Sequence, residues 1–333
     1  MPKKIGKMNE FQLIQRYFRE AAELQLLSPD TGVLQGIGDD CALLQIPKGA
    51  MALSVDTLVA GVHFPESATA GDIAERALCT ALSDLAAAGA KPLWFTLALT
   101  LPKNSIYTSA DWLKNFSDAL FRRANKHQIV LVGGDTTSGP LSVSIQVMGE
   151  VEPQQALRRD SANAGDFVCV TNFIGDGAAA LPLVLGQQSF DGTHADYLRD
   201  RFYRPEPRFT ESKYIQKLAS AALDISDGLV ADLNHICEES DLGAVIFVDD
   251  LPISPAVQAV ASIEQQRLWA LTGGDDYELC FTVSPEKMPE LAMLIAQGKL
   301  QAAVVGEMVQ GAGVVCELNG EIYSLAKQGY QHF

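Results

Sequence analysis

The sequence lacks the features of disulfide-bonded, zinc-binding and membrane-spanning proteins. Its six cysteines are scattered and form no Cys-x-x-Cys pair, which is typical of reduced thiols in a cytoplasmic protein. No apolar run approaches the roughly 18 residues that span a bilayer. Lys3, Lys4 and Lys7 are not followed by the apolar stretch of a signal peptide. We therefore expect a cytoplasmic protein with no membrane partner.

Basic residues and nucleotide-binding signatures are also scarce. The 25 Lys and Arg residues face 41 Asp and Glu residues, which gives a net charge of −16, and no Lys/Arg-rich run occurs. We expect no nucleic-acid partner, because such binding depends on basic groups that neutralise phosphates. There is no Gly-x-x-x-x-Gly-Lys-Ser/Thr P-loop, and Gly311-Ala312-Gly313 lacks the rest of a dinucleotide fingerprint. An acidic protein of this kind can still bind phosphates through divalent cations.

What the sequence does contain is a recurring acidic pattern at the edges of apolar segments. The first example, Gly36-Ile37-Gly38-Asp39-Asp40, places two carboxylates side by side before a short apolar run. Two such charges about 4 Å apart repel by ~4 kcal/mol at an effective dielectric constant near 20. Each carboxylate alone is an ordinary turn residue, but the repetition favours a site for Mg²⁺ ions and phosphates. The further examples are Asp56, Asp84, Asp135, Asp224, Asp227 and the pair Asp275-Asp276.

The length of 333 residues suggests two domains. A polar stretch that begins near residue 152 predicts the boundary, so we assign residues 1–151 to an N-terminal domain and 152–333 to a C-terminal domain. Both are expected to be α/β domains. Apolar periodicity predicts helices over 72–88 and 109–126, strands over 51–55, 93–101, 129–132 and 222–225, and a hairpin with its turn at 319–320.

Several of these positions allow a structural as well as a functional interpretation. Gly133 to Thr137 is either a phosphate and metal loop or a turn that ends a strand. Ser226-Asp227-Gly228 is either an anion site at a helix start or a simple cap, although Asp224 on the preceding strand favours metal binding. Asp84 alone would usually lie on a solvated helix face. Taken singly, His63 would ordinarily be a structural histidine, Arg159 a surface charge and Tyr330 a packing aromatic.

In combination, six stretches resemble the thiamine-monophosphate kinase family, within the superfamily of aminoimidazole ribonucleotide synthetase. They occur in the family's order over most of the chain. They are Gly36 to Asp40, Ser54 to Leu58, Leu82 to Ala86, Gly133 to Thr137, Ile225 to Gly228 and Gly273 to Leu279. The resemblance implies an α/β (α+β) fold in two domains. The N-terminal domain would have a mixed sheet with helices, bind metal and ATP, and pair in a dimer barrel. The C-terminal α/β sandwich would complete the active site.

The resemblance also implies ATP-dependent phosphorylation of thiamine monophosphate to thiamine diphosphate, by direct Mg²⁺-assisted in-line transfer in a homodimer. The implied Mg²⁺ ligands are Asp39, Asp40, Ser54, Val55, Asp56, Asp84, Asp135, Asp224 and Asp227. The implied ATP contacts are Gly134, Asp135, Arg159 and Ser226, and the implied thiamine-side contacts are His63, Asp275 and Tyr330. Asp135, Arg159 and Asp227 would be the catalytic residues among these, and K⁺ is a further candidate ion.

The proposed chemistry agrees with the residues present. The nucleophile would be a phosphate oxygen of the substrate, and because the second pKa of a phosphate monoester is about 6, this oxygen is already largely anionic at neutral pH. No general base is then needed, which fits the lack of an obvious one. Catalysis would consist of positioning and charge neutralisation by several Mg²⁺ ions, with an arginine assisting.

Two positions depart from the family pattern, and other functions remain open. Val55 replaces the usual Thr, so only its backbone carbonyl could bind metal, and Asp275 replaces the usual Glu, which shortens its reach. Selenophosphate synthetase would need a reactive Cys near the N-terminus, but the first is Cys41. Aminoimidazole ribonucleotide synthetase shares the metal and ATP parts. A non-catalytic metal-binding protein and a two-metal phosphatase are the alternatives from other classes.

Overall fold

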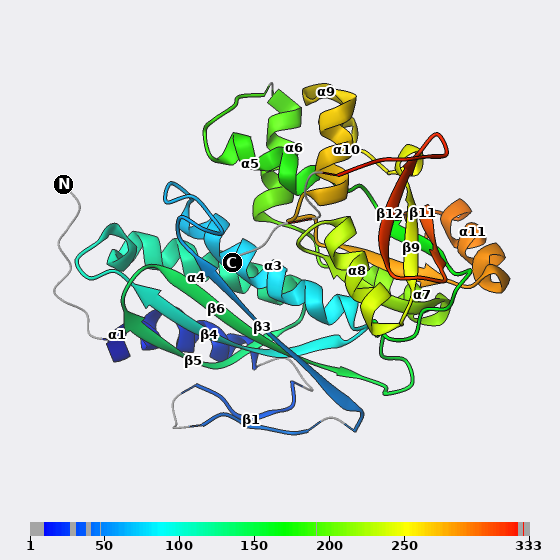
Figure 1. The fold of residues 1–333 in the computed structure, drawn as a ribbon. Coiled ribbons are helices and arrows are strands. Elements are labelled where there is room, and N and C mark those ends of the chain that lie inside the picture. The colour runs from blue at the N-terminus through cyan, green and yellow to red at the C-terminus, as the bar shows by residue number, and fades with distance from the viewer. Residues whose placement is uncertain are drawn as a thin grey trace. The chain divides into compact units, whose positions relative to one another are not determined.

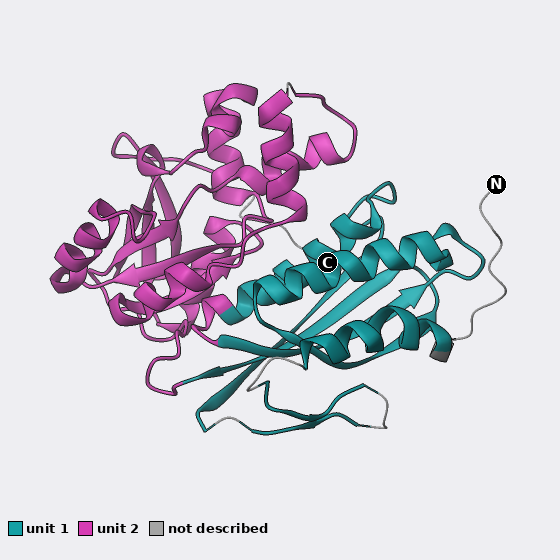
Figure 2. Cartoon of the chain, turned by 180° about the vertical axis from the view of Figure 1, so that it is seen from behind, with its two compact units in different colours: residues 1–85, 91–151 teal, residues 86–90, 152–333 magenta. Residues whose placement is uncertain are grey.

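The computed structural model describes residues 10–26, 31–37, 41–46, 48–190, 192–325 and 329. The chain forms two compact units, shown in different colours in Figure 2. Unit 1 comprises residues 1–85 and 91–151, and unit 2 comprises residues 86–90 and 152–333. No helix in the described ranges is long and apolar enough to cross a membrane.

Unit 1 is built on a four-stranded mixed sheet with the strand order β3-β6-β4-β5. The pairs β3–β6 and β6–β4 are antiparallel, and β4–β5 is parallel. A separate two-stranded ribbon pairs β1 with β2. The elements are α1 Glu10–Ile14, η1 Gln15–Arg19, α2 Glu20–Gln25, β1 Val33–Gln35, β2 Leu43–Leu44, β3 Ala50–Val59, α3 Ala70–Ala87, β4 Lys91–Leu101, η2 Ile106–Thr108, α4 Ala110–Lys126, β5 Val130–Ser138 and β6 Ser142–Val151.

The two faces of this sheet have different surroundings. Helices α3 and α4 run along one face, and the β1–β2 ribbon lies on the other (Figure 1). The ribbon covers the end of the sheet at Trp94, whose indole N–H donates a hydrogen bond to the Thr31 carbonyl (2.7 Å). Beyond the ribbon, Met51, Leu53 and Val55 of β3 expose half or more of their surface. One face therefore holds the core, and the other presents apolar side chains to the surface.

Local sequence signals explain the two long helices of unit 1. The hydroxyl of Ser109 accepts a hydrogen bond from the Trp112 N–H and caps α4, which ends near the basic residues Arg123 and Lys126. The predicted helix over 109–126 is thereby confirmed. Helix α3 begins two residues before the predicted start and is nearly all buried. Its many alanines allow this, because they pack closely without losing side-chain entropy on burial.

The predicted end of strand β5 was wrong. We expected the strand to stop at residue 132 and to deliver the glycines in a turn, but β5 continues from Val130 to Ser138. Gly134 pairs with Leu97 of β4 and has a φ of 153°. A Cβ atom on Gly134 would lie only 1.9 Å from the Leu97 carbonyl oxygen. The glycine is therefore required by backbone packing within the sheet.

Unit 2 contains a seven-stranded mixed sheet with the order β13-β12-β9-β11-β7-β10-β8. Its strands are β7 Phe167–Thr171, β8 Ala219–Ile225, β9 Gly243–Phe247, β10 Glu278–Val283, β11 Ala302–Val309, β12 Gly313–Leu318 and β13 Glu321–Ile322. Its helices are α5 Asp176–Val184, α6 Gly192–Tyr203, α7 Phe209–Leu218, α8 Leu229–Glu239, η3 Val248–Asp250, α9 Pro255–Val260, α10 Ile263–Thr272, η4 Pro285–Lys287 and α11 Met288–Ala296.

Both faces of this second sheet are buried. Leu233 of α8 and Leu271 of α10 belong to the core on one face, and Ile215 of α7 and Leu291 of α11 belong to the core on the other. Only β9 and β12 run parallel among the paired strands described. The predicted hairpin after β12 is confirmed, with Asn319 and Gly320 at φ values of 53° and 79°.

Candidate active site

Strand β3 and helix α3 bring two of the predicted carboxylates together. Ser54 and Asp56 alternate onto the helix-covered face of β3, and the Ser54 hydroxyl donates a hydrogen bond to Asp84 Oδ2 (2.5 Å). Asp84 is half-buried and does not lie on a solvated face. Burial, and secondly the charge of Asp84, raise the pKa of Asp56 to about 6. The two carboxylates and the hydroxyl offer oxygen ligands to a cation. The positive charge of a bound cation would favour the ionised form of Asp56 and offset its raised pKa.

Val55 lies on the opposite face of β3 from Ser54 and Asp56. Its side chain is 61% exposed, and the alternation of a strand makes this orientation inevitable. The isopropyl group has no atom that could bind a metal ion. If Val55 belongs to the metal set, its ligand atom must be the backbone carbonyl oxygen, as expected from the sequence.

Asp135 is not brought close to Asp56 within one chain. Along the register, Asp135 pairs with Ala98, Ala98 with Ser144 and Ser144 with Thr57. Paired residues share a face, so Asp135 lies on the exposed face and Asp56 on the helix-covered one. Strands β3 and β5 are also the two edges of the sheet, separated by roughly 14 Å at three strand spacings. These two predicted ligands therefore cannot share a cation inside a single protomer.

The His63 ring has a defined proton position. Its Nδ1 accepts a hydrogen bond from the Val59 N–H (3.0 Å), so the neutral ring carries its proton on Nε2. The backbone around it is also held, because the buried guanidinium of Arg76 donates from Nε to the His63 carbonyl (3.1 Å). His63 is half-buried. These two hydrogen bonds hold the His63 ring and its backbone in one orientation.

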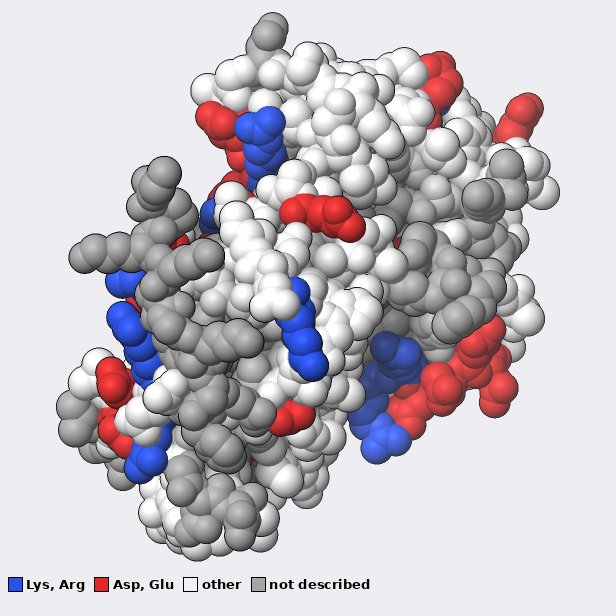
Figure 3. Space-filling model, turned by 90° about the vertical axis from the view of Figure 1, so that its left-hand side faces the viewer, with Lys and Arg blue, Asp and Glu red and all other residues white. Residues whose placement is uncertain are grey.

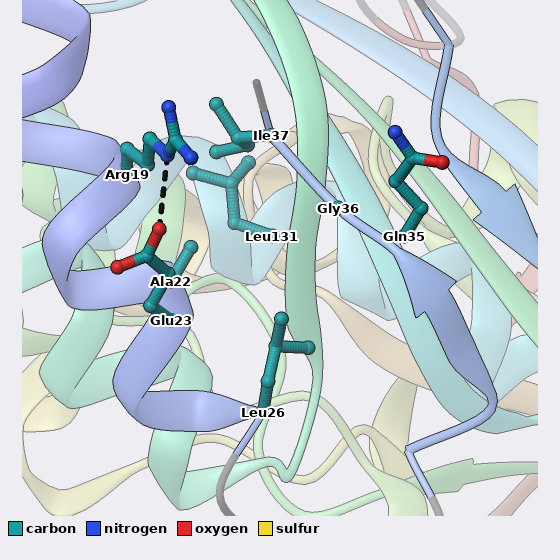
Figure 4. A pocket seen from close by; sticks show the side chains of 8 residues that line it. All are labelled: Arg19, Ala22, Glu23, Leu26, Gln35, Gly36, Ile37 and Leu131. Carbon is teal, nitrogen blue, oxygen red and sulfur yellow. Dashed lines mark hydrogen bonds and ion pairs between the residues drawn. The ribbon is translucent and has the colours of Figure 1, made fainter. Parts of the chain in front are cut away.

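A cavity of about 260 Å³ lies between the N-terminal helical segment and strand β5. Figure 4 shows Arg19 and Glu23 on the helical side, joined by an ion pair of 2.9 Å. The cavity adjoins the predicted Gly36–Asp40 motif through Gly36 and Ile37. Its lining is Arg19, Ala22, Glu23, Leu26, Gln35, Gly36, Ile37 and Leu131. A smaller neighbouring cavity shares Ile37 and Leu131 and reaches Gly133 to Thr136 of β5.

In unit 2, the predicted metal and nucleotide residues lie where strand β8 turns into helix α8. Asp224 is 7% exposed near the end of β8, and Ser226 and Asp227 are half-buried in the turn that follows. The expected anion site at the helix start is already filled. Asp232 Oδ2 accepts hydrogen bonds from the N–H groups of residues 226, 227 and 228. Burial raises the pKa of Asp232 to about 6, although these N–H donors oppose the shift.

The adjacent acids Asp275 and Asp276 have different environments. Asp275 is half-buried, has a φ of 71° and accepts a hydrogen bond from the Tyr277 hydroxyl (3.1 Å). Asp276 is fully buried, and its carboxylate accepts the N–H groups of Gly175 (2.7 Å) and Gly177 (3.0 Å). Burial raises the pKa of Asp276 to about 8, against the pull of those donors. Asp276 therefore caps helix α5. The expectation that this acid converges with the others on a metal ion is wrong.

A buried ion network supports this loop, and the sequence patterns did not indicate it. Arg201 donates hydrogen bonds to Asp176 (3.2 Å), to Glu278 (2.8 Å) and to the Asp276 carbonyl (3.0 Å). Arg208 makes a two-point contact with Glu278. Burial raises the pKa of Glu278, but the two guanidinium groups act against it and keep the carboxylate paired. The partners lie far apart in sequence, so no local pattern could have revealed them.

Arg159 is the one predicted cationic residue of the site. It is exposed, and its carbonyl accepts a hydrogen bond from the Ser240 hydroxyl (2.8 Å). The neighbouring Arg158 is instead paired with Asp160, and this pairing lowers the pKa of Asp160. Across the described ranges, no carboxylate pairs with the Arg159 guanidinium. Its charge is therefore available to a phosphate.

Three predicted residues, Asp39, Asp40 and Tyr330, lie outside the described residues. Within the described part of the chain, no three His, Cys, Asp or Glu side chains stand close enough together to hold a metal ion. The donors that do come together, Ser54, Asp56 and Asp84, carry oxygen ligands only. Hard oxygen donors fit Mg²⁺ and disfavour zinc or copper.

The face drawn in Figure 3 carries charged side chains of both signs. On the face drawn in Figure 3, the described Lys and Arg side chains lie among Asp and Glu side chains and uncharged residues. They form no continuous basic area on that face among the residues described. This distribution agrees with the net charge of −16.

The chain matches two family models that together cover most of its length. Residues 38–151 match "AIR synthase related protein, N-terminal domain", and residues 163–319 match "AIR synthase related protein, C-terminal domain". The protein therefore belongs to the AIR synthase-related class. The predicted two-domain fold is confirmed.

Comparison with individual proteins narrows the class. The thiamine-monophosphate kinase of Escherichia coli K12 is 45% identical over 97% of this chain and 98% of its own. The crystal structure of thiamine-monophosphate kinase from Stenotrophomonas maltophilia has a TM-score of 0.83 and 42% identity, over 91% of this chain and 96% of that one. "AaThiL complexed with AMPPCP and TMP" has a TM-score of 0.75 and 29% identity, over 99% and 100% of the two chains. The chain belongs to the thiamine-monophosphate kinase family, as the six motifs predicted.

Proposed function

We propose that this protein transfers the terminal phosphoryl group of ATP to thiamine monophosphate, giving thiamine diphosphate and ADP. The full-length similarity to thiamine-monophosphate kinases, one of them complexed with AMPPCP and TMP, supports the choice of both substrates. The observation that carries the proposal within this chain is the Ser54, Asp56 and Asp84 group. It concentrates negative charge where an anionic substrate can bind only with cations present.

The chemistry that we propose is direct in-line transfer to a phosphate oxygen of thiamine monophosphate. Ser54, Asp56, Asp84 and the carbonyl of Val55 would hold Mg²⁺ in unit 1, and Asp224 and Asp227 would hold Mg²⁺ in unit 2. Bound Mg²⁺ neutralises the phosphate charges and lowers the electrostatic barrier to transfer. Asp39 and Asp40 complete the proposed set, and K⁺ is a further proposed ion. Inversion of configuration at the transferred phosphorus is the expected stereochemical result, and retention would contradict direct transfer.

The chain's own residues would then orient the two substrates. Gly134, Asp135 and Ser226 are proposed contacts of ATP, and the cavity of about 260 Å³ beside Ile37 and Leu131 is the proposed place for its base. The exposed guanidinium of Arg159 would stabilise charge on the transferred phosphoryl group. On the thiamine side, the oriented Nε2–H of His63 would donate to the substrate. Asp275 and Tyr330 are the other proposed thiamine contacts.

We propose that the enzyme acts as a homodimer in which the second copy completes each site. Asp56 and Asp135 lie on opposite edges and faces of one sheet, too far apart to share a cation. Both can serve one reaction if Asp135 of one protomer acts with the Asp56 of its partner. The apolar residues Met51, Leu53 and Val55 on the exposed sheet face support an interface there. We place the reaction in the cytoplasm, which fits six free cysteines, five of them buried.

A coupled assay of thiamine diphosphate formation tests the proposed function. The purified protein is incubated with Mg²⁺, ATP and thiamine monophosphate, and separately with the phosphorylated substrate of aminoimidazole ribonucleotide synthetase. Product only from thiamine monophosphate supports the proposal. Turnover of the other substrate alone would contradict it. Binding of Mg²⁺ that is independent of a non-hydrolysable ATP analogue, without turnover, would favour a metal-storage protein.

A further inference from the structure

The turn between β8 and α8 is held by a carboxylate from inside the protein. Asp232 lies in the first turn of α8, is 5% exposed and directs one oxygen, Oδ2, back towards the strand end. That oxygen accepts three consecutive backbone N–H groups, from Ser226 (3.0 Å), Asp227 (2.9 Å) and Gly228 (3.0 Å). Successive N–H groups of this kind form a concave anion site. In this chain, the anion is a side chain of the protein itself.

The carbonyl groups of the same turn are also used internally. The Asp275 N–H donates to the Ser226 carbonyl (2.9 Å), and the Tyr277 N–H donates to the Ile225 carbonyl (2.8 Å). Gly228 has a φ of 117°, and a Cβ there would lie 2.8 Å from the backbone of Thr272. Both edges of the turn are thus tied to neighbouring segments of unit 2. The N–H groups of the turn already donate to Asp232, so a phosphate or a metal ion would have to be bound by side chains.

We propose that Asp232 is a positioning residue for the nucleotide and metal side of the site, acting through the backbone of residues 226–228. The inference rests on the proposed function, since it assumes that Ser226 and Asp227 contact ATP and Mg²⁺. Asp232 fixes the turn so that these two side chains project in a set direction. It also adds a negative charge behind them. Recognition of the phosphates therefore depends on bound cations, because the backbone donors that other helix starts offer to phosphates are occupied.

The test uses two substitutions of Asp232 and a matched control. Asp232→Asn keeps an oxygen acceptor but removes the charge, and Asp232→Ala removes both. Glu239→Gln makes the same charge change on an exposed residue of the same helix. We expect KM for ATP and the Mg²⁺ concentration for half-maximal activity to rise about tenfold in Asp232→Asn. Exchanging a charged acceptor for a neutral one weakens a hydrogen bond by an amount that corresponds to roughly a tenfold change in an equilibrium constant. The rise should be larger in Asp232→Ala. KM for thiamine monophosphate should change less than twofold in the Asp232 variants. In the Glu239→Gln enzyme, all of these constants should change less than twofold.

Binding of AMPPCP with Mg²⁺, measured by calorimetry on the full-length protein, should weaken in the same order. Amide hydrogen exchange provides a readout that needs no ligand. The amides of residues 226–228 should exchange at least tenfold faster in Asp232→Asn than in the wild type, with the rest of α8 unchanged. Unchanged exchange at these amides, or a lower thermal stability with both KM values intact, would overturn the proposal.

A substitution of Asp227 separates this inference from the proposed function. Asp227→Asn should weaken binding of AMPPCP with Mg²⁺ whatever the role of Asp232. If Asp227→Asn binds normally, the turn is not part of the nucleotide site and the proposed site assignment fails. If Asp227→Asn binds weakly but the Asp232 variants bind as the wild type does, the positioning role alone is wrong. Should Asp232→Ala not fold, Asp232→Asn decides the question.

Discussion

Replacing Asp56 by Asn should abolish activity and at the same time stabilise the metal-free protein. Burial and the neighbouring Asp84 raise the pKa of Asp56 from 3.8 to about 6. The pKa of Asp56 is higher in the folded than in the unfolded protein, so the folded state favours the protonated carboxyl. The wild type therefore loses unfolding free energy as the pH rises from about 4 through 6. The shift corresponds to about 3 kcal/mol of unfolding free energy above pH 7. Asn has nearly the same shape and avoids that cost.

The expected increase for Asp56→Asn is therefore up to about 3 kcal/mol at pH 8 and about half of that at pH 5. It is measured by denaturant unfolding in EDTA at both pH values. Added Mg²⁺ should stabilise the wild type, releasing a proton near pH 6, and should have little effect on the variant. The control is Asp118→Asn, which removes an exposed carboxylate of α4. A variant that is no more stable than the wild type at pH 8 in EDTA would refute the reasoning.

Three further predictions concern the dimer, the glycine strand and the histidine. Asp135→Asn should be inactive yet folded. Mixing it with inactive Asp56→Asn under subunit exchange should restore about a quarter of wild-type activity, because half of the dimers then hold one intact site out of two. No recovery of activity would place both residues of a site in one protomer. Gly134→Ala should lower the unfolding free energy by about 3 kcal/mol or more through backbone overlap, whereas Gly133→Ala, whose Cβ has room, should cost about 1 kcal/mol or less; equal losses would contradict this. His63→Ala should raise KM for thiamine monophosphate about tenfold through loss of one hydrogen bond, and an unchanged KM would remove that contact.

The family, the two-domain fold, several caps and turns, and part of the candidate site could be predicted from the sequence, because each depends on short local patterns. Six short motifs in order identified the family and the two-domain fold. Caps and turns were also predictable, because Ser109 and the Asn319-Gly320 pair act on their own neighbouring backbone. The predicted ligands Ser54, Asp56 and Asp84 share one environment in the structure, since strand alternation and the helix face place them together.

Other features depended on contacts between distant segments. The glycines before Asp135 resembled a loop, but pairing with β4 extends the strand through them. Asp276 resembled its neighbour Asp275 in sequence, and only the approach of Gly175 and Gly177 makes it a buried helix cap. A carboxylate has the same local signature whether it faces a cation, a backbone N–H or a guanidinium. Residue type and spacing determined which groups could bind a cation or a phosphate, whereas packing over long sequence separations decided which of them are already occupied within the protein.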